Sequence, residues 1–299
     1  MHNWALPGKE QNAALFALIE KMTKPDEKRR IPAKEAVADP AFAQPGVEIL
    51  THDFSKTPFY WANQGKYQWV ECKFMKPVVE KLLNETTCAS CHRYKIAIKV
   101  NVRKVVRIEN QRHWERFSNK RRELTDMHRR DMVDRKIDIP EATLDDACNE
   151  VFLWHGLPSD KVPIVANAGL DERIANCNGL YGAGIYLTDQ WCKAMQYARA
   201  GGCSIRHKQC GKKWRCECQG IKRVLLCRVL MGEPYRVQPQ DQLKHQRRPP
   251  DRPEAGPGML YDSLIAEPHW ANNYKQSHFE MVTFDRSSVY PEWIIELDW

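Results

Sequence analysis

The stretch Gly179-Leu-Tyr-Gly-Ala-Gly-Ile-Tyr-Leu-Thr-Asp189 is the most informative part of the chain, because it joins a glycine-rich turn to a short apolar run. The glycines mark the turn, and residues 184–187 are typical of a strand. Thr188 or Asp189 then supplies an N-cap for a helix that we expect to run to about Arg199.

A second informative stretch lies upstream, where the apolar run 151–155 predicts a strand that ends at His155 and Gly156. Glycine at such a point lets a ligand approach the backbone closely, and the histidine can donate a hydrogen bond to a hydroxyl group. Taken alone, this pair also fits a structural histidine in a core.

The remaining elements follow from periodicity. Further strands are expected at 67–74, 96–108, 223–230, 260–266, 280–285 and 293–297. Helices are expected at 77–84, at 163–168 and over the charged segment that carries Trp114, Phe117 and Leu124. Many short strands with few, brief helices do not form a regular βαβ succession. The sequence therefore predicts an α+β fold rather than a doubly wound parallel sheet.

Composition restricts the class of protein. The 299 residues are 42% hydrophobic and 28% charged, which fits a globular protein rather than a disordered or fibrous one. The first residues show no basic segment followed by an apolar run, and no 18 apolar residues occur together. The eleven cysteines lack the spacing of a disulfide framework. We therefore expect a nuclear or cytoplasmic protein that is neither secreted nor bound in a membrane.

The net charge of +8 is unevenly distributed. Residues 103–136 hold twelve Lys or Arg against six acids, a net charge of +6. Because these acids are interspersed, a solvated helix surface is favoured over a nucleic-acid footprint, although the segment allows an anionic partner.

Four separated blocks carry a family resemblance: the His155-Gly156 strand end, residues 169–173, residues 179–197 and residues 279–290. Their order and spacing resemble the catalytic domain of the poly(ADP-ribose) polymerase family, within it the tankyrase-like branch. The resemblance covers about 99–299 and implies the ADP-ribosyltransferase split β-sandwich. We therefore divide the chain into a partly loop-rich extension of unknown role at 1–95 and a catalytic domain at 96–299.

The resemblance also implies roles for individual residues. The family's triad corresponds to His155, Tyr186 and Glu280, which would transfer ADP-ribose from NAD⁺ to protein acceptors and release nicotinamide. In this correspondence, Gly156 pairs with the carboxamide of nicotinamide, and Tyr197 stacks on the ring opposite Tyr186. The other two assigned residues are Asp171, near the adenine, and Lys193, near the acceptor. Transfer of single units or of a polymer is compatible with all of these residues.

One position departs from the family pattern. The family usually has serine one residue after the lysine, where it binds the carboxamide, and this chain has Ala194. Losing one neutral hydrogen bond costs on the order of 1 kcal/mol, so NAD⁺ binding should be weakened and not abolished. A catalytically weak module that binds NAD⁺ or ADP-ribose is therefore an alternative function, and ADP-ribosylation of nucleic acid through residues 103–136 is another.

A cysteine cluster predicts a metal site. Five candidate ligands fall within residues 203–218, and a set of thiolates with one histidine is typical of structural, tetrahedral zinc. The tankyrase-like branch carries a zinc site at this point of the domain. The expected Zn²⁺ ligands are Cys203, His207, Cys210 and Cys218, with Cys216 as the alternative fourth ligand.

A second group, Cys88-Ala-Ser-Cys91-His92, matches the pattern for c-type haem attachment. Haem ligation needs an export route and a second axial ligand. Free thiols, or a second zinc site that includes Cys72 or His113, fit an intracellular protein better.

Overall fold

The computed structural model describes residues 57–58, 61, 67–87, 100–125, 132–134, 137–139, 142–198, 221–271, 274–276 and 278–298. The chain divides into two units, Met1–Asp53 and Phe54–Trp299, and every described residue lies in the second unit.

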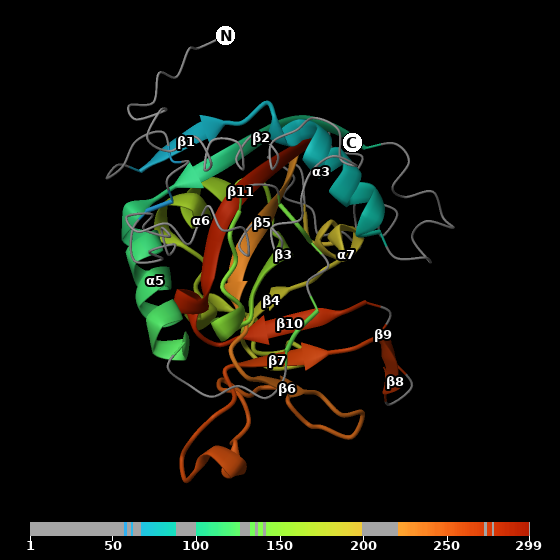
Figure 1. Ribbon diagram of the computed structural model, residues 1–299. Coiled ribbons are helices and arrows are strands. Elements are labelled where there is room, and N and C mark those ends of the chain that lie inside the picture. Colours follow the sequence, from blue (N-terminus) through green and yellow to red (C-terminus); the bar gives the residue numbers. More distant parts are fainter. Residues whose placement is uncertain are drawn as a thin grey trace, which may run out of the picture. The chain divides into compact units, whose positions relative to one another are not determined.

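The larger of two main sheets carries five strands, β1 (Gln68–Glu71), β2 (Asn101–Glu109), β3 (Glu150–Gly156), β5 (Lys222–Leu230) and β11 (Val289–Asp298) (Figure 1). Their order is β1-β2-β11-β5-β3, and all neighbours are antiparallel. The central strand β11 contains Pro291, which cannot donate to the ladder, and the register with β5 shifts between Pro291 and Trp293. The proline is thus accommodated at an irregularity.

The second sheet has the order β4-β10-β7-β6, with β4 at Ile185–Leu187, β10 at Glu280–Thr283, β7 at Ser263–Ala266 and β6 at Pro234–Arg236. Only the β6–β7 pair among these is parallel. A separate hairpin joins β8 (His269–Ala271) to β9 (Tyr274–Gln276). The predicted α+β class is confirmed.

The two main sheets pack face to face. Strands β3 and β5 contribute Val151, Leu153, Leu225, Cys227 and Val229, and the smaller sheet contributes Ile185, Leu187, Ile265 and Met281. Each set consists of alternate residues, as the two-residue period of a strand requires. This apolar layer is the core of a β-sandwich.

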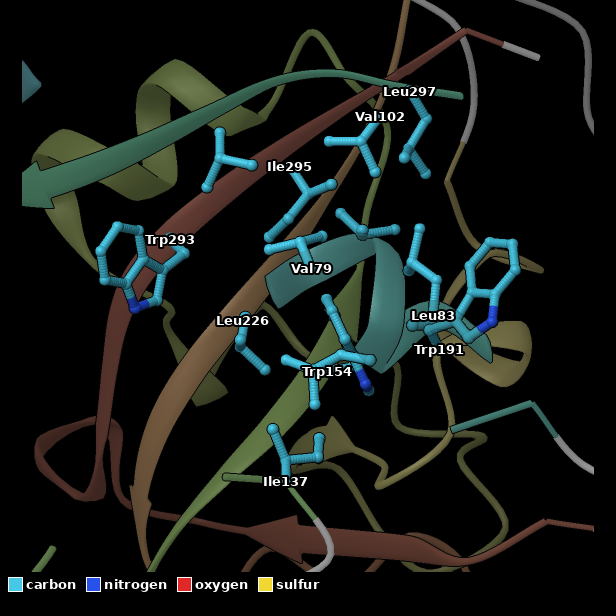
Figure 2. Packing of buried hydrophobic residues seen from close by; sticks show 14 of the residues in the cluster. Val79, Leu83, Val102, Ile137, Trp154, Trp191, Leu226, Trp293, Ile295 and Leu297 are labelled. Carbon is cyan, nitrogen blue, oxygen red and sulfur yellow. The ribbon is translucent and has the colours of Figure 1, made fainter. Parts of the chain in front are cut away.

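The opposite face of the five-stranded sheet is covered by two helices, α3 (Met75–Glu85) and α7 (Trp191–Ala194) (Figure 2). Val79 and Leu83 of α3 pack against strand residues such as Leu226 and Ile295. Strands buried on both faces read as continuous apolar runs, which is why β5 is so hydrophobic.

Two indole hydrogen bonds between residues far apart in sequence join the end of α3 to β3 and α7. The indole N–H of Trp154 in β3 donates to the hydroxyl of Thr86, and that of Trp191 in α7 donates to the hydroxyl of Thr87. Both threonines directly follow α3 and in turn donate to carbonyls of its last turn, on Leu82 and Leu83.

Helix α5 (Gln111–Thr125) has the apolar stripe that the sequence predicts. Trp114 and Phe117 pack with Trp61 and Tyr290, and the ring centroids of Trp114 and Tyr290 lie 5.2 Å apart. The remaining short elements are α6 (Val162–Ala168) and the 3-10 turns η3 (Asp146–Cys148), η4 (Glu172–Ile174), η5 (Pro253–Ala255) and η6 (Arg286–Ser288).

Most predicted elements are confirmed, and one helix is wrong. The helix expected to run to Arg199 ends at Ala194, and Gln190 rather than Thr188 or Asp189 is its N-cap. Thr188 is instead held as a β-bridge partner of Trp154. The strand expected at 280–285 ends at Thr283.

Both β1 and α3 lie upstream of residue 96, yet β1 pairs with β2 and α3 packs in the same core. The division at residue 95 stays a prediction. No helix among the described residues is long and apolar enough to cross a bilayer.

Candidate functional site

Glu280 and Tyr186 project from the same face of the four-stranded sheet. In the antiparallel pair of β10 and β4, Val282 lies opposite Tyr186 and Met281 lies opposite Leu187. Met281 and Leu187 point into the core between the sheets. Alternation therefore directs Glu280, Val282 and Tyr186 to the other face, away from the five-stranded sheet.

The end of β3 brings His155 to the same place. Trp154 and Thr188 exchange two backbone hydrogen bonds of 2.7 and 3.0 Å, which join β3 to the end of β4. One residue further along, the Nδ1 atom of His155 lies 2.8 Å from the backbone carbonyl oxygen of Tyr186. The three triad candidates, 125 residues apart in sequence at the extremes (155 to 280), are thus carried by joined strands.

The hydrogen bond fixes what His155 can do. A carbonyl only accepts, so Nδ1 carries the proton, and burial lowers the pKa of the ring, which keeps it neutral. The other nitrogen, Nε2, is then an acceptor. In this tautomer a ligand hydroxyl would donate to Nε2, and the expectation that His155 binds a ligand hydroxyl stays a prediction.

The hydroxyl of Tyr186 is used to shape the glycine-rich turn. It accepts from the N–H of Tyr181 at 2.8 Å and donates to the carbonyl of Gly182 at 2.9 Å. A Cβ atom on Gly179 would lie 2.5 Å from this hydroxyl, so the turn needs glycine there. Burial, aided by the charge of Glu280, raises the pKa of Tyr186, so the hydroxyl stays protonated and its ring is what remains for a ligand.

Lys193 lies directly on the candidate catalytic carboxylate. Its Nζ is 2.7 Å from Oε1 of Glu280, and the two side chains are only 12% and 8% exposed. The same ammonium lies 5.7 Å from the ring centroid of Tyr197, which is 54% exposed. Three of the predicted residues therefore meet at one point, and this ion pair is not visible in the sequence.

Gly156 is in close contact with α7. A Cβ atom at this position would lie 1.8 Å from the carbonyl oxygen of Ala194, so only glycine fits. Ala194 itself is buried beside it. The end of β3 and the helix that carries Lys193 are consequently fixed relative to each other.

Asp171 lies on a separate element. It caps η4 by accepting from the N–H of Arg173 at 3.0 Å, and it binds the Arg173 guanidinium through two further bonds of 2.8 and 2.6 Å. These hydrogen bonds from Arg173 lower the pKa of Asp171 to about 2. Arg286 lies 3.7 Å from the same carboxylate. The contacts of Asp171 in the described residues are thus with arginines rather than with the triad.

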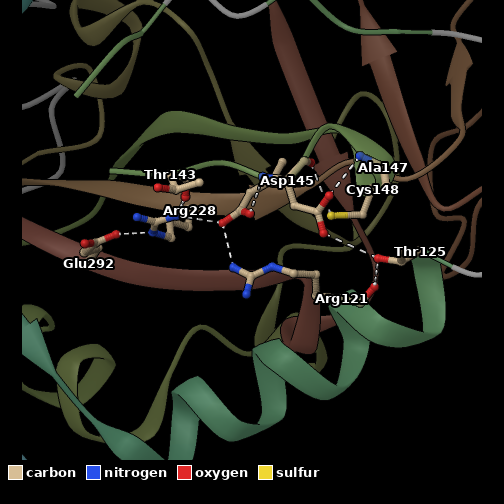
Figure 3. Close-up of polar contacts among 9 residues, drawn as sticks. Arg121, Thr125, Thr143, Asp145, Ala147, Cys148, Arg228 and Glu292 are labelled. Carbon is tan, nitrogen blue, oxygen red and sulfur yellow. Dashed lines mark hydrogen bonds and ion pairs between the residues drawn. The ribbon is translucent and has the colours of Figure 1, made fainter. Parts of the chain in front are cut away.

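Two arginines of the basic segment 103–136, Arg107 and Arg121, are buried, whereas Arg103, Arg112 and Arg122 are exposed. Arg107 pairs with Glu109, and Arg121, only 1% exposed, binds Glu150 at 2.8 Å. Figure 3 shows the buried network in which Arg228 joins the same glutamate to Glu292. We expected the basic residues of α5 to be solvated, and this expectation is wrong for Arg121, because it is buried in its ion pair with Glu150 of β3.

The predicted zinc ligands Cys203, His207, Cys210 and Cys218 lie outside the described residues, as do Cys216 and the Cys88 to His92 group. In the part of the chain that is described, no three His, Cys, Asp or Glu side chains gather as a metal site. The zinc site stays a prediction.

Two positioning residues were not predicted. Thr188 donates from its hydroxyl to the carbonyl of Phe279 at 2.7 Å, which ties β4 to the residue before Glu280. Asn110 binds the end of α6. A polar residue directly after a strand is the only sequence signal that either gives.

Residues 77–258 match the family model described as the poly(ADP-ribose) polymerase catalytic domain. The match spans more than half of the chain, contains His155, Gly156, Asp171 and Tyr186, and ends before Glu280.

Proposed function

Because the chain belongs to the poly(ADP-ribose) polymerase catalytic-domain family, we propose that it transfers ADP-ribose from NAD⁺ to protein acceptors, its own side chains included. Membership indicates ADP-ribosyltransferase activity with NAD⁺ as substrate. The observation that carries the finer proposal is the meeting of Glu280, Tyr186 and His155 on joined strand ends.

Glu280 acts on the bond that breaks. As the bond between C1′ of the ribose and nicotinamide breaks, its electron pair leaves with nicotinamide and the sugar gains oxocarbenium character. A carboxylate fixed in a nearly water-free site stabilises that charge strongly. In this proposal one oxygen of Glu280 binds Lys193 and the other accepts a hydrogen bond from the ribose 2′-hydroxyl. The acceptor side chain attacks C1′ as nicotinamide leaves, and the acceptor's proton passes to water.

The nicotinamide ring fits between Tyr186 and Tyr197. The hydroxyl of Tyr186 is held in the turn, which leaves its ring as a stacking surface, and the half-exposed ring of Tyr197 is supported by Lys193. Gly156 offers backbone groups to the carboxamide. Ala194 offers no hydroxyl there.

The adenosine half lies towards His155 and Asp171 in this proposal. Because Nε2 of His155 is an acceptor, it receives a hydrogen bond from a hydroxyl of the adenosine ribose. The Asp171 carboxylate, ionised across the physiological range, presents an acceptor edge to the adenine amino group.

The test compares wild type with Glu280→Gln and measures intact mass and nicotinamide release after incubation with NAD⁺. Glu267→Gln is the matched control, since Glu267 is exposed and its ion pair, 3.5 Å from Arg236, is exposed on both sides. We expect mass additions and nicotinamide from wild type and from Glu267→Gln alone. Equal activity of Glu280→Gln would refute the role of this carboxylate, and the mass pattern separates single units from polymer.

A catalytically weak module that binds NAD⁺ or ADP-ribose is the second candidate function. Two observations favour it: the missing hydroxyl at Ala194, and the engagement of Glu280 by Lys193. Binding of ADP-ribose without nicotinamide release from NAD⁺ would establish it. Nucleic acid as the acceptor is less favoured, because Arg107 and Arg121 are buried in ion pairs.

We also propose that the chain belongs to the tankyrase-like branch, on the order and spacing of the four blocks, and that it carries the zinc site of that branch at the cysteine cluster 203–218. One equivalent of zinc by elemental analysis, lost in a variant with serine at Cys203 and Cys210, would support it. We also propose a nuclear or cytoplasmic location, which the free thiols of Cys72 and Cys227 favour. Fluorescent tagging in cells tests the location.

A further inference from the structure

The segment from Gly169 to Ile174 is held by elements distant in sequence. It leaves the C-terminus of α6, passes through Gly169 with a φ of +82°, and forms η4, which carries Asp171 and Arg173. A helix C-terminus leaves carbonyl groups without partners inside the helix, and these must find donors elsewhere. What supplies the donors therefore decides where the segment lies.

Asn110 supplies them. Its side-chain Nδ2 donates to the carbonyls of Ala166 and Asn167 at 3.1 and 3.3 Å. Its Oδ1 accepts from the N–H of His113 at 3.3 Å, which caps the first turn of α5. One buried amide thus joins the start of α5 to the end of α6.

Asn110 is itself rigidly placed. Its backbone N–H donates to the hydroxyl of Tyr290 at 3.2 Å, and that hydroxyl donates to the carbonyl of Ile108 at 2.7 Å. Asn110 is 4% exposed and Tyr290 is fully buried, so neither contact competes with water. The ring of His113 packs against Gly169, where an added Cβ would lie 3.3 Å from it.

The other end of the segment is held by η6, the turn that precedes the strand of Tyr290, β11. The backbone N–H of Arg286 donates to the carboxylate of Glu172 at 3.2 Å, and the Arg286 guanidinium lies 3.7 Å from Asp171. Arg286 opens η6, which leads directly into β11 and Tyr290. The segment is therefore pinned at both ends to a frame built on β11.

We propose that Asn110 is a positioning residue for the adenosine side of the NAD⁺ site, an inference that rests on the proposed function and on Asp171 facing the adenine. It holds the last turn of α6, and thereby the direction in which the Asp171 segment leaves the helix. The nicotinamide side is built from β4, β10, α7 and the end of β3, and the hydrogen bonds of the Asn110 side chain go to α5 and α6 instead. Removing the amide should consequently loosen one half of the site and leave the other half intact.

The experiment measures two ligands on three proteins by isothermal titration calorimetry. The ligands are ADP-ribose, which carries the adenosine half, and nicotinamide, which carries the other half. The proteins are wild type, Asn110→Ala and Asn149→Gly. Asn149 is the matched control, because its buried amide also binds backbone groups, the carbonyl of Gly232 and the N–H of Val133, and its φ of +51° suits glycine.

We expect Asn110→Ala to bind ADP-ribose about fivefold or more weakly, the factor that one lost neutral hydrogen bond produces, and to bind nicotinamide within twofold of wild type. Asn149→Gly should bind both ligands as wild type does, even where it melts earlier. If Asn110→Ala fails to fold, Asn110→Ser serves, because serine is a good N-cap acceptor for the N–H of His113 and lacks the amide Nδ2 that donates to α6.

Equal weakening of both ligands, or of neither, would overturn the inference. If wild type binds neither ligand, the proposed function fails and the inference fails with it. If wild type binds both and the two half-site ligands still respond alike in the variant, the proposed function stands and only the role of Asn110 is refuted.

Discussion

Replacing Gly156 with alanine tests whether β3 and α7 form one unit at the centre of the site. The added Cβ would lie 1.8 Å from the carbonyl oxygen of Ala194, and such atoms essentially never approach closer than 3.0 Å, so one element must retreat by at least about 1.2 Å. The clash is with backbone, which cannot rotate away. Because Lys193 precedes Ala194, the retreat moves its ammonium away from Glu280.

A displacement of about 1 Å at a reacting centre can cost roughly 100-fold in rate. We therefore expect Gly156→Ala to lose about 100-fold in kcat/KM for NAD⁺, measured as nicotinamide release. Gly258→Ala is the control, since nothing lies within 4 Å of a Cβ added there; unlike Gly156, Gly258 has a positive φ, +77°, so this variant carries backbone strain without a clash. Activity of Gly156→Ala within threefold of this control would refute the reasoning, because it would mean that the contact imposes no geometry on the site.

Three further predictions follow from buried groups. Glu150→Gln should lower the free energy of unfolding by about 3 kcal/mol or more, roughly 6 °C or more in Tm, because it removes the buried carboxylate charge that both Arg228 and Arg121 bind. Burial alone would raise the pKa of Glu150, but the charges of Arg228 and Arg121 outweigh it and lower the pKa. The stabilisation by ionised Glu150 is therefore complete above about pH 4.5 and is lost as the pH falls through the lower pKa of the folded protein. Urea titrations at pH 7 and pH 3.5 should show the difference in unfolding free energy between wild type and variant closing. Lys193→Met should abolish nicotinamide release and lower Tm, whereas Lys193→Arg should retain part of both, since only arginine keeps a cation beside Glu280; equal loss in the two variants would contradict the ion-pair role. Ala194→Ser should lower the KM for NAD⁺ by up to about fivefold, and an unchanged KM would mean that no carboxamide lies beside this position.

The strands could be predicted because their signals are local, whereas the triad is a prediction taken from the family resemblance. The apolar runs that became β3 and β5 lie between turn residues, and the glycines before Tyr186 mark a turn in any context. The order of the blocks then related His155, Tyr186 and Glu280 without any knowledge of their distances.

The contacts between those blocks could not be predicted, because they depend on pairs far apart in the chain. Nothing near Arg121 in sequence indicates that Glu150 would bury it, and nothing near Lys193 indicates its contact with Glu280. The length of α7 was overestimated for a related reason. Thr188 has the side chain of a helix cap, but its backbone is committed to the bridge with Trp154.

The two indole contacts behind the site bear on how this protein can be divided. Trp154 lies in β3 and Trp191 in α7, and their indole N–H groups donate to Thr86 and Thr87. Both threonines precede residue 96, where the family resemblance places the start of the catalytic domain. A fragment that starts there would lose the threonine acceptors of both indoles and would expose to water the apolar sheet face that α3 covers. A fragment made for expression should therefore begin before α3, so that the helix and its two threonines stay with the sheet.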